Sequence, residues 1–270
     1  MGSTQSKYKK YNKYKLIVAS MLNDEIECLK LLKTDININL RNKHNENCFF
    51  YACKNNMNKL LNELIKKKSL HYGIISKLTK KTEILFCSEY NINDNITHKI
   101  LDNVKIPIYY TYIDHNNNTA IMNFIINNNY NIVKKIMNIQ TDFSCVNYKY
   151  QNILHLLIKH YMYDLCFNIN IDNFINKTDD NNFTPFMYLC SNNKFNNNFK
   201  RLFIKLLKHN SSLLIKNNNG LCSLDYIVNN NDLFIYFLQI SHVIINKDKI
   251  ISYCKNKNDT KYNIILKNII

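Results

Sequence analysis

The stretch Phe183-Thr184-Pro185-Phe186-Met187-Tyr188-Leu189-Cys190 is the clearest of several similar segments in this chain. Residues 151–158 (QNILHLLI) and 118–125 (NTAIMNFI) are related to it. Aligned on Thr184, Asn152 and Thr119, the three segments lie 32 and 33 residues apart. Segments that recur every 20 to 50 residues or so indicate a repeat architecture, in which each unit is one small supersecondary motif.

The same register extends in both directions along the chain. Its anchor residues are Tyr14, Asn47, Thr82, Thr119, Asn152, Thr184 and Cys222. The steps outside the central three are 33, 35 and 37 residues upstream and 38 downstream. Short insertions near residues 106–108 and 192–198 account for the two longest steps. The period is therefore close to 33 residues.

Other columns of this alignment agree. Two residues past the anchors stand Leu16, Phe49, Ile84, Ile121, Leu154, Phe186 and Leu224. Five past stand Ala19, Ala52, Cys87, Phe124, Leu157, Leu189 and Ile227, and six past stand Ser20, Cys53, Ser88, Ile125, Ile158, Cys190 and Val228. Steps of three and four place these residues on one face of a helix. Each unit is predicted to begin with a buried helix.

A second helix is predicted after a polar break, for example at residues 26–32, 60–65 and 132–137. In the last of these, Ile132 and Ile136 belong to an apolar stripe, and Lys134 and Lys135 lie on the other side. The unit is therefore helix, turn, helix and polar connector.

The chain resembles the ankyrin repeat family, whose first helix opens with Thr-Pro-Leu-His-x-Ala. Residues 184–186 match the start of this signature, residues 154–155 match its middle, and Ala19 and Ala52 match its last residue. The resemblance implies an all-α, ankyrin-type helix-turn-helix solenoid of about seven degenerate repeats over residues 14–240. A basic N-terminal tail (1–13) would precede it, and C-terminal capping helices (241–270) would follow.

The connectors depart from the family pattern, which has Asp five residues and Gly two residues before the Thr. Asp114 and Asp179 fit the first position, with Asn42, Asn147 and Asn217 as near substitutes. At the second position stand Asn12, Asn45, Lys80, Asn117, Tyr150, Asn182 and Gly220. Gly suits a left-handed backbone and Asn is the next most tolerant residue. We expect the fold to survive with less regular connectors.

The resemblance implies a non-catalytic scaffold that binds another protein through its connectors and the outward side of its first helices. Tyr148 and Tyr150, which flank Lys149, look most like a contact patch, because Tyr is enriched at interfaces. The full set of predicted partner-binding residues is Lys43, His44, Glu46, Asp114, His115, Tyr148, Lys149, Tyr150, Asp179, Asp180, Asn217 and Asn218. The alternative is that these are merely solvated loop residues. We expect a monomer.

Catalytic and metal-binding patterns do not emerge from the sequence. The family histidine that matches His155 is structural, and His155 and His160 are five residues apart rather than the four of a helical metal pair. There is no HExxH, Gly-rich phosphate loop or GxSxG, and the nine cysteines include no CxxC pair. We predict no enzyme, no cofactor, no metal and free buried thiols.

The N-terminus fits an N-myristoylation pattern, with Gly2 as acceptor and Ser6 at the favoured position. Lysines follow at positions 7, 9, 10, 13 and 15, and a polybasic patch is the usual second signal for membrane attachment. No stretch approaches the roughly 18 apolar residues of a membrane-spanning helix. The predicted location is intracellular, either cytoplasmic or peripheral to a membrane.

The net charge of +16 raises nucleic acid as an alternative partner. The densest basic segment contains Lys54, Lys59, Lys66, Lys67, Lys68, Lys77, Lys80 and Lys81. Lysine suits nonspecific phosphate contact rather than base readout, so a solvated helix face is the favoured interpretation.

Abundant Asn, Lys and Ile share AT-rich codons, which alone can account for part of the charge. This composition resembles that of ankyrin-repeat proteins from giant DNA viruses or AT-rich parasites. The resemblance implies host proteins as partners.

Overall fold

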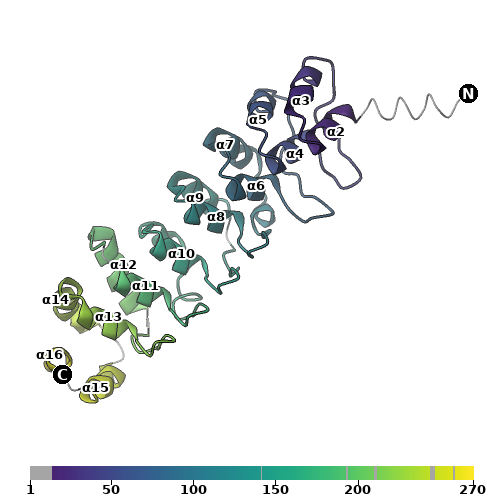
Figure 1. The fold of residues 1–270 in the computed structure, drawn as a ribbon. Coiled ribbons are helices and arrows are strands. Elements are labelled where there is room, and N and C mark those ends of the chain that lie inside the picture. The colour runs from purple at the N-terminus through teal and green to yellow at the C-terminus, as the bar shows by residue number, and fades with distance from the viewer. Residues whose placement is uncertain (1–13, 141, 193, 210–211, 244–246, 258) are drawn as a thin grey trace, which may run out of the picture. The chain divides into compact units, whose positions relative to one another are not determined.

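The computed structural model describes residues 14–140, 142–192, 194–209, 212–243, 247–257 and 259–270. Gly2 and the rest of the basic tail lie outside the described residues. The regular elements among the described residues are helices, with two isolated antiparallel bridges, Ile75 to Thr82 and Ile113 to Thr119. The chain divides into two compact units, residues 1–143 and 144–270. Figure 1 labels the helices in their order along the chain.

The first unit is a series of antiparallel helix pairs, one pair per repeat. The pairs are α2 (Lys15–Met21) with α3 (Glu25–Leu31), α4 (Cys48–Lys54) with α5 (Asn58–Leu64), α6 (Glu83–Glu89) with α7 (Asp94–Asn103), and α8 (Ala120–Ile126) with α9 (Tyr130–Met137). A 3-10 helix, η1 (Pro107–Tyr110), lies in the third connector, where the sequence predicted an insertion. First helices pack on first helices, α2 on α4, α4 on α6 and α6 on α8, which gives two helical layers.

The second unit continues the pattern with two differences. Its elements are α10 (Ile153–Lys159), η2 (Leu165–Asn168), α11 (Pro185–Ser191), α12 (Asn197–Lys208), α13 (Ser223–Asn229), α14 (Asn231–Ile240), η3 (Ser241–Val243), α15 (Lys247–Lys255) and α16 (Thr260–Ile269). The fifth repeat has the short 3-10 helix η2 where the others have a second α-helix. After the seventh repeat, α15 and α16 pack on each other in the segment for which capping helices were predicted.

The core consists of the aligned columns. Every residue in the columns two, five and six past the anchors is buried, from Leu16 to Val228. Two of the polar members, Ser20 and Ser88, donate their hydroxyls to the carbonyls of Ile17 and Leu85 one turn earlier. The predicted buried face of the first helices is thus confirmed.

The anchor residues are the N-caps of the first helices. The side chain of Thr184 accepts a hydrogen bond from the Met187 N–H at 3.2 Å, and Asn47 accepts one from Phe50 at 2.9 Å. Such a bond satisfies one of the backbone donors that the first turn leaves free. Asn47, Thr82, Asn152 and Thr184 therefore share one role, which is to cap the helix that follows.

The residue two positions before the anchor has a left-handed backbone in the second to the seventh repeat. The φ angles are Asn45 67°, Lys80 56°, Asn117 57°, Tyr150 56°, Asn182 57° and Gly220 76°. A second left-handed position follows nine residues after the anchor, at Asn23, Asn56, Asn91, Asn128 and Tyr161. Asn predominates because it is the side chain that best tolerates this conformation after Gly.

Candidate partner-binding surface

We use the word tip for the turn that immediately precedes each first helix. In the sixth repeat, Asp179 forms the tip: its Oδ1 accepts the N–H groups of Asn181 at 3.0 Å and Phe183 at 2.8 Å. The backbone closes the same turn, because Asp179 N–H donates to the Phe183 carbonyl at 3.0 Å. A buried carboxylate thus sets the shape of the loop.

The same construction recurs in four other repeats. The corresponding residues are Asn42, Asp114, Asn147 and Asn217, each accepting the N–H groups two and four residues later. In the third repeat the Oγ of Ser76 replaces the carboxylate or amide, accepting from Leu78 and Thr79. The Asp-or-Asn column noted in the sequence is therefore a column of turn-forming residues.

Four of the tips are tied to the first helices behind them by the second side-chain atom of the same residue. Asp179 Oδ2 accepts the Tyr188 hydroxyl at 2.6 Å, and Asn217 Nδ2 donates to the Tyr226 hydroxyl at 2.9 Å. In each case the partner lies nine residues later, on the first helix. The tip and the helix consequently form one rigid piece.

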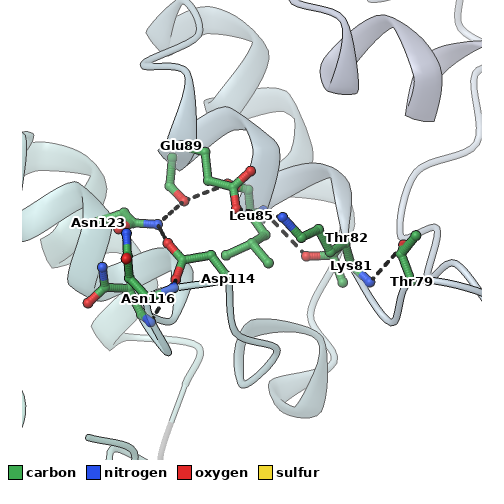
Figure 2. A network of polar contacts seen from close by, with 10 residues as sticks. Thr79, Lys81, Thr82, Leu85, Glu89, Asp114, Asn116 and Asn123 are labelled. Carbon is green, nitrogen blue, oxygen red and sulfur yellow. Dashed lines mark hydrogen bonds and ion pairs between the residues drawn. The ribbon is translucent and has the colours of Figure 1, made fainter. Parts of the chain in front are cut away.

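Figure 2 shows this arrangement in the fourth repeat. Asn123 on α8 donates to Asp114 Oδ2 at 3.0 Å and to the hydroxyl of Ser88 on α6 at 3.4 Å, which joins the third and fourth repeats. Nearby, Lys81 and Glu89 form an ion pair of 2.9 Å with little solvent exposure.

Glu89, Asp114 and His115 are one group, among the described residues, whose ligand atoms lie within 4.8 Å of one another. Two carboxylates and an imidazole suit a divalent cation. However, Lys81 already balances Glu89, and Asp114 already accepts bonds that shape its tip. We assign no metal to this group.

Glu46 connects the second and third tips. Its carboxylate accepts hydrogen bonds from Ser76 at 2.6 Å, from the Tyr51 hydroxyl, and from Asn42 at 3.0 Å. Burial on its own would raise the pKa of Glu46, but these three donors lower it below its usual value. The side chain is therefore a buried acceptor within the scaffold.

Backbone bonds between neighbouring tips hold them in a row within each unit. In the first unit, Lys77 N–H donates to the His44 carbonyl at 2.9 Å. In the second unit, Asp180 N–H donates to the Lys149 carbonyl at 2.9 Å, and Asn218 N–H donates to the Asn181 carbonyl at 3.1 Å. Side chains that point outward from the tips therefore have fixed spacings.

The structure sorts the predicted partner-binding residues into two groups. Glu46, Asp114, Asp179 and Asn217 are buried and form the tips, so their side chains offer a partner little surface. His44 and Lys149 are half-buried, and the exposed members are Lys43, His115, Tyr148, Tyr150, Asp180 and Asn218. Tyr148 and Tyr150 are 56% and 64% exposed, and the Lys149 ammonium lies over the Tyr148 ring at 5.4 Å. In each unit taken by itself, the exposed residues are the candidate contacts for a partner.

A third column of polar residues went unnoticed in the sequence. Asn55, Asn127 and Asn192 stand eight residues past their anchors, and each donates from Nδ2 to a backbone carbonyl of the preceding repeat. The acceptors are the carbonyls of Ser20 at 2.7 Å, Ser88 at 3.0 Å and Ile158 at 3.1 Å. The column was detectable as a recurring Asn, but the general abundance of Asn obscured it.

His155 has the structural role that the resemblance implied. It is completely buried, its Nδ1 accepts the Asn152 N–H at 3.3 Å, and its Nε2 contacts the Phe183 carbonyl at 3.0 Å. Burial lowers the pKa of this imidazole to about 4. The neutral ring joins the start of α10 to the next tip.

Several of the clustered lysines have partners. Lys66 pairs with Glu63 at 2.6 Å and Lys81 with Glu89 at 2.9 Å, while the Lys54 ammonium lies over the Tyr51 ring. Eight of the nine cysteines are buried thiols, as the sequence predicted. Across the described ranges, no helix has the length and apolar content needed to cross a bilayer.

These features define an all-α protein built from helix-turn-helix repeats with stabilised tips. No protein-family model matches the chain, and no curated protein matches it. Among solved structures, the chain is similar to the ankyrin repeat domain of Bcl-3, described as a unique member of the IkappaB protein family. The identity is 10%, the match covers 78% of this chain and 92% of that one, and the TM-score is 0.46.

Proposed function

We propose that this chain is a non-catalytic scaffold that binds another protein through the exposed side chains of its tips. The observation that supports this most is how the tips are held: four are bonded to their own first helices, and backbone bonds join the tip of residues 148–150 to the next tip. A partner that meets a preformed surface does not have to order it, and this lowers the cost of binding.

The tip of residues 148–150 is the centre of the proposed surface. Tyr148 and Tyr150 expose large aromatic rings next to a cation, the combination that recurs in binding hot spots. Tyr150 also occupies a left-handed position, where Tyr is less favourable than Gly or Asn. A side chain that costs stability at an exposed site is a candidate for a binding role.

Two finer parts of the proposal rest on the sequence. Gly2 is the proposed site of myristoylation, with the adjoining lysines as the second membrane signal. Host proteins are the proposed partners, on the basis of the composition and the resemblance to viral or parasitic ankyrin-repeat proteins.

The proposal is tested by affinity capture with the full chain from a host-type cell lysate at moderate salt, with and without nuclease. We expect a discrete protein that remains bound after nuclease treatment. Recovery that disappears with nuclease, or falls steeply between low and moderate salt, would instead favour the lysines as a nonspecific nucleic-acid surface.

A further inference from the structure

The first repeat exposes a cluster of large apolar side chains, which we call the N-terminal edge. Its members are Val18, Met21 and Leu22 of α2 and its turn, and Ile26 of α3. Their exposed fractions are 38%, 51%, 75% and 70%. An isolated exposed aliphatic residue needs no explanation, but this helix pair exposes four, and two of them, Val18 and Leu22, line the same groove.

Comparison with the second repeat shows what this edge lacks. The residues that correspond to Met21, Leu22 and Ile26 are polar: Lys54, Asn55 and Lys59. Asn55 donates to the preceding repeat, so Leu22 stands in the column that faces a preceding neighbour. The N-terminal edge instead has an apolar face suited to a further chain segment.

The edge also carries a groove and an acidic border. The groove has a volume of about 300 Å³ and is lined by Val18, Ala19, Leu22 and Leu31, with Asp24, Glu27 and Lys15 at its sides. Carboxylates concentrate here although the chain as a whole has a charge of +16. Together with burial, Asp24, Glu25 and Glu27 raise the pKa of the Cys28 thiol to about 12. The chemistry fits a basic segment with a few large apolar side chains.

We propose that residues 1–13 of the same chain dock on the N-terminal edge. This segment has four lysines, two tyrosines (Tyr8 and Tyr11) and no acidic residue. It joins the chain at the edge itself, just before α2, and such tethering gives an effective concentration of order millimolar. A symmetric second copy is disfavoured, because its identical acidic border would meet this one.

The docked state and membrane attachment would use the same lysines. The N-terminal edge therefore competes with an anionic membrane for the tail, whether or not Gly2 is acylated. This inference does not depend on the tip surface or on its partner.

The test is limited trypsin cleavage of the full chain at Lys7, Lys9, Lys10 and Lys13, followed by mass spectrometry. Cleavage of a docked segment tracks the population of its undocked state. Two edge variants, Leu22→Asn and Ile26→Lys, copy the residues of the second repeat. The control is Ile235→Lys on α14, which changes a comparably exposed isoleucine (56%) in the other unit. All three sites are exposed, so folding is checked simply by circular dichroism.

We expect each edge variant to speed cleavage of the tail by about fivefold, in line with the burial of one aliphatic side chain, and the control to leave the rate unchanged. Glu27→Lys should also speed it, because the charge of the border reverses. Tail cleavage that is insensitive to all three edge changes would overturn the proposal. Protection that grows with protein concentration would also overturn it, since a second copy would then cover the edge.

Discussion

The Tyr188 hydroxyl donates a 2.6 Å hydrogen bond to Oδ2 of Asp179, nine residues earlier, while Oδ1 of the same carboxylate accepts two backbone N–H groups of the tip. One buried side chain thus joins the tip to α11. Asn217 and Tyr226 repeat the relationship in the next repeat. The shape of the candidate surface therefore depends on residues that a partner hardly touches.

Asp179→Ala should lower the free energy of unfolding by about 2 kcal/mol, because it leaves two N–H groups of the tip and one phenol without their acceptor. Asp179→Asn should cost less than about 1 kcal/mol, since Asn147 and Asn217 form the same turn. Urea denaturation of the three proteins measures the difference. Equal losses in the two variants would show that the turn bonds do not stabilise the tip.

Substitution to or from Gly at a left-handed position should change the free energy of unfolding. Lys80→Gly should raise the free energy of unfolding by about 1 kcal/mol, because a lysine at φ 56° is strained and Gly is not. Gly220→Ala should lower it by about 1 kcal/mol; an added Cβ there meets no atom within 4 Å, so the backbone angle alone is responsible. Thermal and urea unfolding measure both changes. A Gly220→Ala variant as stable as the wild type would contradict the role given to the backbone angle.

Glu83 should make the first unit less stable as the pH rises. Its carboxyl is completely buried, accepts the Ile74 N–H at 2.9 Å and contacts the Tyr109 hydroxyl at 2.5 Å. Burial raises the pKa of Glu83 from 4.5 to about 7. Its stabilising contribution is therefore complete below pH 4.5 and is lost as the pH rises through about 7, a change of about 3 kcal/mol.

Glu83→Gln removes this titration and is the matched variant. The stability of wild type minus that of Glu83→Gln should fall by about 3 kcal/mol between pH 4.5 and pH 8. Taking the difference cancels the contribution of His155 to the pH dependence of stability. The low pKa of His155 in the folded protein makes both proteins more stable as the pH rises. A difference that stays constant with pH would mean that Glu83 is not the titrating group.

Asp225 should hold α15 and α16 against the seventh repeat. It accepts the Cys222 N–H at 2.8 Å, the hydroxyls of Tyr253 and Tyr262, and the Lys257 ammonium at 3.3 Å. Burial alone would raise the pKa of Asp225, but the hydrogen bonds hold it at about 2. The carboxylate is therefore ionised at neutral pH.

Asp225→Ala should speed amide exchange throughout residues 247–269, because the two tyrosines and the lysine lose their shared acceptor. The free energy of unfolding should fall by about 3 kcal/mol, in the range for a buried charged acceptor. Asp232→Ala, an exposed carboxylate in the first turn of α14, is the control. Unchanged exchange in α15 and α16 would show that apolar packing alone holds them.

The sequence predicted the repeat period, the buried face of the first helices and the left-handed column, because each depends on local spacing that recurs. It did not predict that Glu46, Asp114, Asp179 and Asn217 turn inward. Their role depends on atoms that are distant in sequence, such as the phenol of Tyr188, and polar residues in a loop give no sign of that. It also did not predict η2, where the apolar pattern alone cannot distinguish one 3-10 turn from a short α-helix.

The most direct test of the central claim is parallel capture of the partner by three forms of the full chain. These are the wild type, the double variant Tyr148→Ser/Tyr150→Asn, and the control Tyr161→Asn. Tyr161 is also exposed (43%) and left-handed (φ 61°), but it lies in the turn after α10, at the other end of that helix from the tip. Asn suits both left-handed sites, so folding should be preserved.

We predict that the tip double variant captures about tenfold less partner than the wild type, as expected for two aromatic hot-spot residues. Tyr161→Asn should capture as much partner as the wild type. Equal capture by the double variant and the wild type would contradict a partner surface centred on this tip.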